Sequence, residues 1–236
     1  MLDSESSAVA VSKVSKTYRT TVRLPGRLIP QSSEVSALRN VSFTIWQGDT
    51  VGLLGRNGSG KSTLLQVLAG VLAPTVGEVF VEQRPRLLGL RGLNLPDLSL
   101  LENAELILRA NGYSAKESKT FARDLVRDAD LTEKAFMPYK TLSTGMKARL
   151  SFLLTIVNNP RILLIDEMLS VGDQLLDNAY QSWIDALQAS DRSVVIASHN
   201  MSTIKRMCSR AIVLVRGEIG FEGPVEDAIE FHTSNA

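Results

Sequence analysis

The segment Gly55-Arg56-Asn57-Gly58-Ser59-Gly60-Lys61-Ser62 fits the phosphate-loop pattern GxxxxGK[ST] in full. Residues 50–54 precede it as a short apolar run bounded by glycines, which predicts a buried strand of a parallel or mixed sheet. Residues 62–72 follow it with helical spacing and stop near Pro74. A strand, a glycine-rich loop and a helix in this order favour a phosphate site over a turn that binds nothing.

The loop predicts both the ligand and the residues that hold it. Glycines let successive backbone N–H groups turn inward, and the helix N-terminus adds the positive end of its dipole. We expect Lys61 to reach the β- and γ-phosphates of ATP, as a catalytic and a binding residue, and the Ser62 hydroxyl to bind Mg²⁺. The expected ATP-binding set of the loop is Gly55, Asn57, Gly58, Ser59, Gly60, Lys61, Ser62 and Thr63.

Two acids end a second apolar run, residues 162–165. Buried carboxylates are costly without a partner, so a cation or a reacting water is expected beside Asp166 and Glu167. Asp166 is the candidate for holding Mg²⁺ through a coordinated water, and Glu167 for polarising the attacking water. The alternative is that both acids only cap the following turn, which a phosphate loop upstream disfavours.

The composition and the element pattern set the class of protein. The chain has 236 residues, 44% of them hydrophobic, and a formal net charge of +1, without the basic excess of a nucleic-acid binder. No apolar stretch approaches the roughly 18 residues of a membrane span, so another chain must supply any span. Strand patterns at both ends enclose a helical block over about 84–158, with expected helices at 101–110, 115–129 and 147–157. This predicts one α/β domain, 1–236, with an inserted helical subdomain; residues 19–35 show no hydrophobic period and are expected to form a loop.

Between the loop and the acids lies Leu142-Ser143-Thr144-Gly145-Met146, which resembles the signature motif of ATP-binding-cassette (ABC) ATPases. The resemblance covers about residues 9–231. It implies a phosphate-loop ATPase fold with a mixed sheet core and an antiparallel β subdomain. It also implies that Ser143 and Gly145 contact ATP, that Asp173 belongs to the D-loop and that His199 senses the γ-phosphate. Tyr18 resembles the aromatic residue that stacks on adenine; an ordinary core tyrosine is the alternative.

One expected residue is absent. The family usually has a glutamine in the loop that enters the helical subdomain, and near residues 89–91 there is none. Gln83 comes too early, at the end of the preceding strand. What that glutamine contributes is therefore left unassigned.

The signature STGMKARL, the D-loop LSVGD and the spacing after Tyr18 resemble one branch of the family. Its members are the ATPase subunits that export O-antigen, capsule, teichoic acid or other surface polysaccharides. An added C-terminal sugar-binding domain, present in some of them, is not expected here. A lipid or drug exporter ATPase is the second interpretation, and a non-transport ABC ATPase belongs to a different class.

The resemblance also implies partners and a location. Signature and phosphate loop close on one nucleotide only between two chains, which implies a head-to-tail homodimer with two ATP molecules. A membrane permease would receive the glycan and hold the ATPase at the cytoplasmic face of the membrane. The leucine-rich stretch over 87–101 is either a docking groove for that permease or ordinary core.

Overall fold

The structure, a computed structural model, describes residues 7–22, 31–88, 95–157, 160–166, 190–198 and 201–235. The chain divides into two units. The first contains Met1–Pro85, Arg161–Asp166 and Ser190–Ala236, and the second contains Arg86–Pro160 and Glu167–Ala189.

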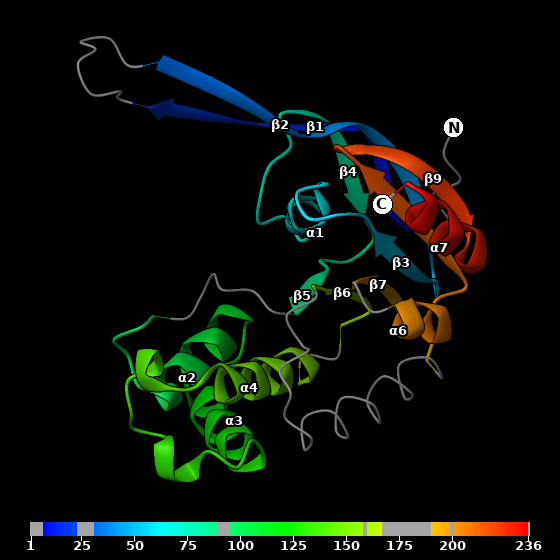
Figure 1. Cartoon of the computed structure of the whole chain (residues 1–236). Helices are drawn as coiled ribbons and strands as arrows, with labels where there is room; N and C mark the ends of the chain where they lie inside the picture. The colour runs from blue at the N-terminus through cyan, green and yellow to red at the C-terminus, as the bar shows by residue number, and fades with distance from the viewer. Residues whose placement is uncertain are drawn as a thin grey trace. The chain divides into compact units, whose positions relative to one another are not determined.

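A mixed sheet forms the centre of the first unit (Figure 1). Its strands follow the order β6 (Ile162–Ile165), β7 (Ser193–Ala197), β3 (Thr50–Leu54), β8 (Arg210–Val215) and β9 (Glu218–Pro224). The first four are parallel and β9 is antiparallel to β8. Every residue of β6 and β7 is buried, which explains the unbroken apolar runs at 162–165 and 194–197. The strands expected at 50–54 and 162–165 are confirmed as β3 and β6.

A second sheet of the first unit is wholly antiparallel, with the order β2 (Gln31–Trp46), β1 (Ser7–Val22) and β4 (Val76–Val81). The loop expected over 19–35 is wrong at 19–22 and 31–35, because β1 and β2 stay paired as far as Val22 and Gln31; residues 23–30 lie outside the described residues. This part forms a two-stranded ribbon that leaves the sheet (Figure 1). A ribbon with no core beneath it needs no alternation of apolar residues, so its strands leave no hydrophobic period in the sequence.

Among the described residues of this unit, the helices are α1 (Lys61–Leu68), α6 (Met201–Met207) and α7 (Val225–Ser234). The helix expected over 62–72 ends early, at Leu68, with Gly70 at a φ of 67° just beyond it. The sequence pattern did not predict α7. It packs against β8 and β9, where the ring of Phe231 stacks on Phe221 at a centroid distance of 5.5 Å.

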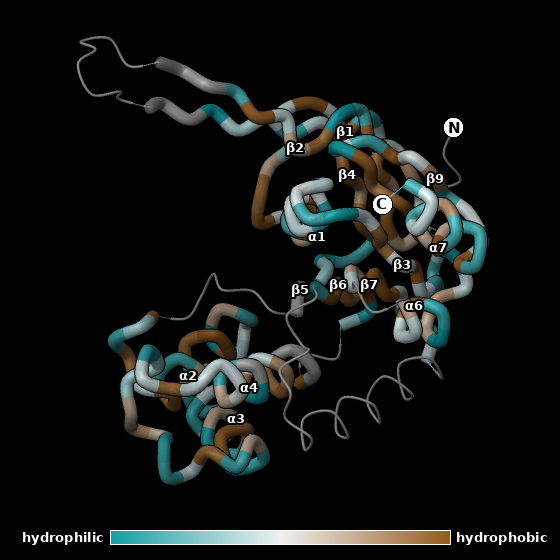
Figure 2. The backbone as a smooth tube through the Cα atoms, in the orientation of Figure 1, coloured by the Kyte–Doolittle hydropathy of each residue, from teal (hydrophilic) through white to brown (hydrophobic). Residues whose placement is uncertain are grey.

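Short strand β5 (Arg86–Leu88) begins the second unit, and α2 (Leu100–Ala110), α3 (Ala115–Asp128) and α4 (Thr144–Ile156) follow. Two 3₁₀ turns, Thr132–Lys134 and Tyr139–Thr141, connect α3 to α4. The three helices expected in this block are confirmed. Their apolar sides, brown in Figure 2, meet in one core that includes Leu100, Leu108, Leu125, Leu150 and Leu154.

Capping boxes begin α2 and α3. Ser99 accepts a hydrogen bond from the N–H of Glu102, and Ser114 from that of Glu117, while each glutamate accepts one in return from its serine N–H. Hydrogen bonds from the serine hydroxyl, and then from the serine N–H, lower the pKa of each glutamate, so the ionised carboxylate stabilises the helix start.

Candidate nucleotide-binding site

The phosphate loop runs from the end of β3 to the start of α1, and two of its glycines have no room for a side chain. Gly55 has a φ of +146°, and a Cβ there would lie 2.5 Å from the Leu214 carbonyl oxygen. Gly60 has a φ of +109°, and a Cβ there would lie 2.6 Å from the Ala37 carbonyl oxygen. Both the backbone angle and the packing therefore require glycine at the two ends of the turn.

Lys61 lies inside the turn, with only 8% of its surface exposed. Its Nζ donates to the carbonyl oxygens of Gly55 at 2.6 Å and of Arg56 at 3.2 Å. A buried ammonium is costly unless oxygens surround it, and these two carbonyls supply that compensation without a ligand. The amine is thus held at the centre of the loop, where a phosphate would meet it.

Tyr18 comes to the same place from β1. Its hydroxyl lies 3.5 Å from Thr63 Oγ1 in the first turn of α1, and its side chain is partly exposed. The Nζ of Lys16 lies 5.7 Å from the centre of the Tyr18 ring. An exposed aromatic ring beside a phosphate loop favours stacking on a nucleotide base over a role in core packing.

Ser62 and Asp166 both belong to the first unit: Ser62 is exposed in the first turn of α1, and Asp166 follows the last residue of β6. A hydroxyl and a carboxylate are hard oxygen donors, which suits Mg²⁺, an ion that takes few protein ligands and keeps water and phosphate oxygens. No group of three or more metal-ligating side chains occurs among the described residues. The donor set therefore fits a metal that arrives with the nucleotide.

Ser143 and Gly145 lie in the second unit, at the start of α4. Ser143 is the N-cap, and its Oγ accepts a hydrogen bond from the N–H of Met146 at 3.3 Å. The signature segment is therefore a helix N-terminus, with backbone N–H groups that an anion can use.

Three expected site residues, Glu167, Asp173 and His199, lie outside the described residues. The same holds for residues 89–94, where the family's glutamine would be expected. The described candidates for the nucleotide site in the first unit, apart from the glycine turn, are therefore Tyr18, Lys61, Ser62, Thr63 and Asp166.

Sequence reasoning missed the backbone groups that hold the loop in place. The N–H of Gly217, in the turn between β8 and β9, donates to the Ser59 carbonyl oxygen at 3.0 Å. The carbonyl oxygen of Gly217 accepts from the N–H of Arg39 at 2.8 Å. The Arg216-Gly217 pair marks a turn in the sequence, but only the fold shows that this turn supports the phosphate loop.

The sequence is similar to those of known proteins. The profile described as "ABC transporter" matches residues 38–170. The chain is 35% identical over 230 residues to the "Teichoic acids export ATP-binding protein TagH" of Listeria innocua, covering 94% of this chain and 68% of that protein. The protein of the same description from Shouchella clausii is 35% identical over 226 residues, which cover 93% of this chain and 62% of that one.

Solved structures agree on the fold. A dimeric ATP-binding cassette in a post-hydrolysis state, bound to ADP and phosphate, matches with a TM-score of 0.72 and 24% identity, over 92% of this chain and 98% of that one. An ATP-binding subunit of an ABC transporter matches with a TM-score of 0.72 and 22% identity, over 97% and 95% of the two chains. The phosphate loop, the signature helix and these similarities lead to one conclusion. The chain belongs to the ABC transporter family and is an ATP-hydrolysing domain of that family.

Proposed function

We propose that this chain hydrolyses ATP for a transporter that exports a cell-surface polysaccharide or its lipid-linked form. The observation that carries the substrate class is the 35% identity to teichoic acid export ATP-binding proteins, which extends over 94% of the chain. The chain spans about two thirds of those relatives, so the proposal concerns the part that they share.

In this proposal Lys61 binds the phosphates of ATP. Its ammonium exchanges the Gly55 and Arg56 carbonyls for the β- and γ-phosphates, so its charge stays compensated when ATP enters. Tyr18 stacks on the adenine, and the N–H groups of the loop hold the phosphate oxygens. Ser62 and Asp166 hold Mg²⁺, which neutralises charge on the phosphates when bound.

Glu167 is the proposed catalytic base and polarises the attacking water. His199 contacts the γ-phosphate, and Asp173 belongs to the D-loop. The support for these three roles is their place in the sequence: Glu167 directly follows Asp166 at the end of β6, and His199 follows the buried strand β7 by two residues.

We also propose that each site is completed by a second copy of the chain. Ser143 and Gly145 begin α4 in the second unit, and from the opposite chain they would close on the γ-phosphate. The likeness to dimeric cassettes supports this arrangement. A membrane permease is the proposed second partner and places the dimer at the cytoplasmic face of the membrane. Among the described residues, no helix has the length and apolar content needed to cross a membrane.

Replacing Glu167 by Gln tests the chemical step. The variant should bind ATP but hydrolyse it at least about a hundredfold more slowly, because an amide cannot polarise water as a carboxylate does. ATPase rates and ATP binding are measured on the same preparation. Asp191→Asn, an exposed acid of the first unit, serves as the control and should keep the wild-type rate. Hydrolysis within a few-fold of wild type would remove Glu167 from the catalytic role.

The substrate class needs a separate test. The chain, co-expressed with its membrane permease in cells that lack their own teichoic acid exporter, should restore polymer on the cell surface, and the Glu167→Gln variant should not. ATPase activity with no surface polymer would reject teichoic acid as the transported polymer and favour the lipid or drug exporter interpretation.

A further inference from the structure

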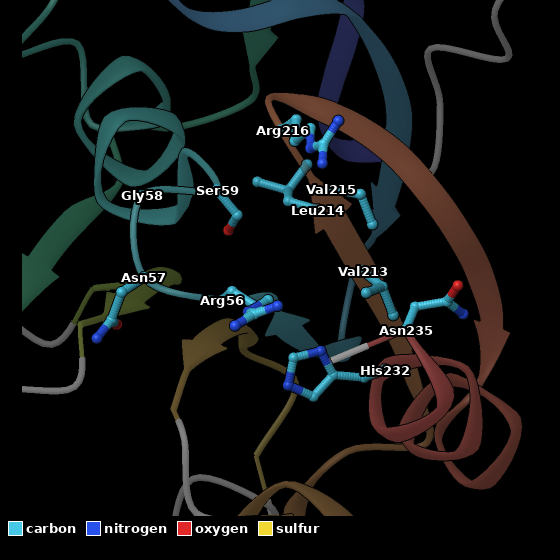
Figure 3. Close-up of a pocket in the computed structure, with 10 residues that line it drawn as sticks. All are labelled: Arg56, Asn57, Gly58, Ser59, Val213, Leu214, Val215, Arg216, His232 and Asn235. Carbon is cyan, nitrogen blue, oxygen red and sulfur yellow. The ribbon is translucent and has the colours of Figure 1, made fainter.

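A pocket of about 510 Å³ lies between the phosphate loop, the end of β8 and the end of α7 (Figure 3). Its wall is formed by Arg56, Asn57, Gly58 and Ser59 of the loop, residues 213–216 at the end of β8, and His232 and Asn235 at the end of α7. Lys61, Ser62, Thr63 and Tyr18 do not line it. Its volume suits a small molecule.

The floor of the pocket holds an unsatisfied hydroxyl. Ser59 is 5% exposed, and its Oγ has no hydrogen-bond partner. A buried hydroxyl without a partner costs about 1–3 kcal/mol, so such groups usually mark a missing water, ion or ligand. In Figure 3 this oxygen turns toward the side of the pocket where Arg56 lies.

Two cations without acidic partners line the same space. Arg56 and Arg216 are exposed, and neither forms an ion pair with any residue in the described part of the chain. In Figure 3 the side chains of Arg56 and His232 point toward one another from the loop and from α7. Asn235 adds an amide, and Val213 to Val215 add an apolar wall. None of the described residues that line the pocket carries a carboxylate.

The pocket is tied to the loop that carries the nucleotide. The N–H of Gly217, next to Arg216, donates to the Ser59 carbonyl oxygen at 3.0 Å. Arg56 offers its side chain to the pocket while its carbonyl oxygen accepts from Lys61. One short segment therefore presents one face to the expected phosphates and another to the pocket.

We propose that this pocket is a second ligand site, separate from the nucleotide site, for a small molecule with an apolar body and one anionic group. Arg56 and Arg216 bind the carboxylate, sulfonate or phosphate, the Ser59 hydroxyl donates a hydrogen bond, and Val213 to Val215 contact the apolar part. The Asn235 amide, whose Nδ2 donates to the Phe231 carbonyl oxygen at 2.8 Å, borders the site. A free metabolite and a lipid-derived acid share this chemistry.

The probe for the test is 1-anilinonaphthalene-8-sulfonate, whose fluorescence rises on binding and which has both required features. Saturating MgADP fills the nucleotide site throughout. The wild-type chain should bind the probe with one saturable site. Arg216→Asn should weaken binding about tenfold, the usual worth of a charge-assisted hydrogen bond. Asparagine suits the φ of 50° at this position, so the turn is preserved.

A second variant tests the pocket by filling it with a bulky side chain and leaves its charge unchanged. Asn235→Phe should abolish the saturable binding, whereas Ser234→Phe, on the neighbouring exposed residue that does not line the pocket, should leave it unchanged. Arg84→Gln, an exposed arginine elsewhere in the first unit, is the control for loss of charge. A saturable site that appears only when MgADP is left out, or equal binding by Arg216→Asn, Asn235→Phe and the wild type, would overturn the proposal.

Discussion

A buried lysine needs oxygen atoms around its charge, and Lys61 obtains two from the carbonyls of Gly55 and Arg56. Those carbonyls belong to the loop itself, so the amine is positioned before ATP arrives. In catalysis such preorganisation matters, because no further reorganisation is needed when charge develops in the transition state.

Lys61→Ala should therefore lose turnover by about a hundredfold or more and bind ATP more weakly, since the charge faces phosphates in both the ground and the transition state. Steady-state ATPase assays and ATP titrations measure the two effects. Lys140→Ala, which removes an exposed lysine paired with Asp97, is the matched control and should behave as wild type. Equal turnover by Lys61→Ala and Lys140→Ala would contradict the assignment.

Two substitutions at Tyr18 separate the contribution of its ring to ATP binding from that of its hydroxyl. Tyr18→Ala should raise the ATP concentration required by roughly tenfold, from lost stacking, and leave kcat nearly unchanged. Tyr18→Phe keeps the ring and removes only the 3.5 Å contact with Thr63, so it should stay near the wild type. KM and kcat are measured for both variants. If Tyr18→Ala lowers the melting temperature but not the nucleotide affinity, Tyr18 is a packing residue only.

Whole strands and helices differed in how well the sequence predicted them, for physical reasons. Buried β6 and residues 194–197 of β7 appear as unbroken apolar runs, and α2 and α3 have amphipathic spacing with serine and glutamate at their starts, so all four were predictable. The ribbon of β1 and β2 was missed because backbone pairing imposes no side-chain period where no core lies beneath. Short α7 was missed because its contacts with β8 and β9 are tertiary.

The candidate site was predictable in its motifs but not in its supports. A fixed pattern of glycines, lysine and serine marks the phosphate loop, whereas the contacts of Gly60 with Ala37 and of Ser59 with Gly217 join distant segments through the backbone. Backbone groups are the same in every residue type, so no sequence pattern marks them. The pocket behind the loop was unpredictable for the same reason.

α4 offers a test of whether a helix cap also has a catalytic role. Ser143→Ala removes a side-chain N-cap and should lower the stability by about 1 kcal/mol, and Ser114→Ala at the start of α3 should cost a similar amount. Only Ser143→Ala should also lower the ATPase rate, because Ser143 is proposed to contact the γ-phosphate of the opposite site. Chemical denaturation and ATPase assays are compared for both variants. Equal activity of the two would make Ser143 a cap alone.

The whole molecule carries its proposed ATP contacts on two units, with the phosphate loop in one and the signature helix α4 in the other. A site shared between copies makes hydrolysis depend on association, so ATP binding and dimerisation support one another by mass action. A site complete within one chain would show no such dependence. The two arrangements can be distinguished with two inactive variants.

Lys61→Ala damages the phosphate loop, and Gly145→Asp places a carboxylate where a backbone N–H should meet the γ-phosphate. Gly145 lies in the first turn of α4, where an aspartate is compatible with the helix dipole, so the variant should fold. Circular dichroism checks this. In a dimer with shared sites, each homodimer has two damaged sites and should be inactive.

Mixing the two inactive preparations produces mixed dimers in which one of the two sites is intact. In a mixed dimer one site collects both lesions, while the other pairs an intact Lys61 with an intact Gly145 from the opposite chain. ATPase activity should therefore reappear on mixing, and it should be highest near equal amounts of the two variants, where mixed dimers are most abundant. A site within one chain predicts instead that Gly145→Asp alone stays active and that mixing adds nothing. That result would separate the signature segment from the nucleotide and leave Ser143 and Gly145 with only the start of a helix to explain them.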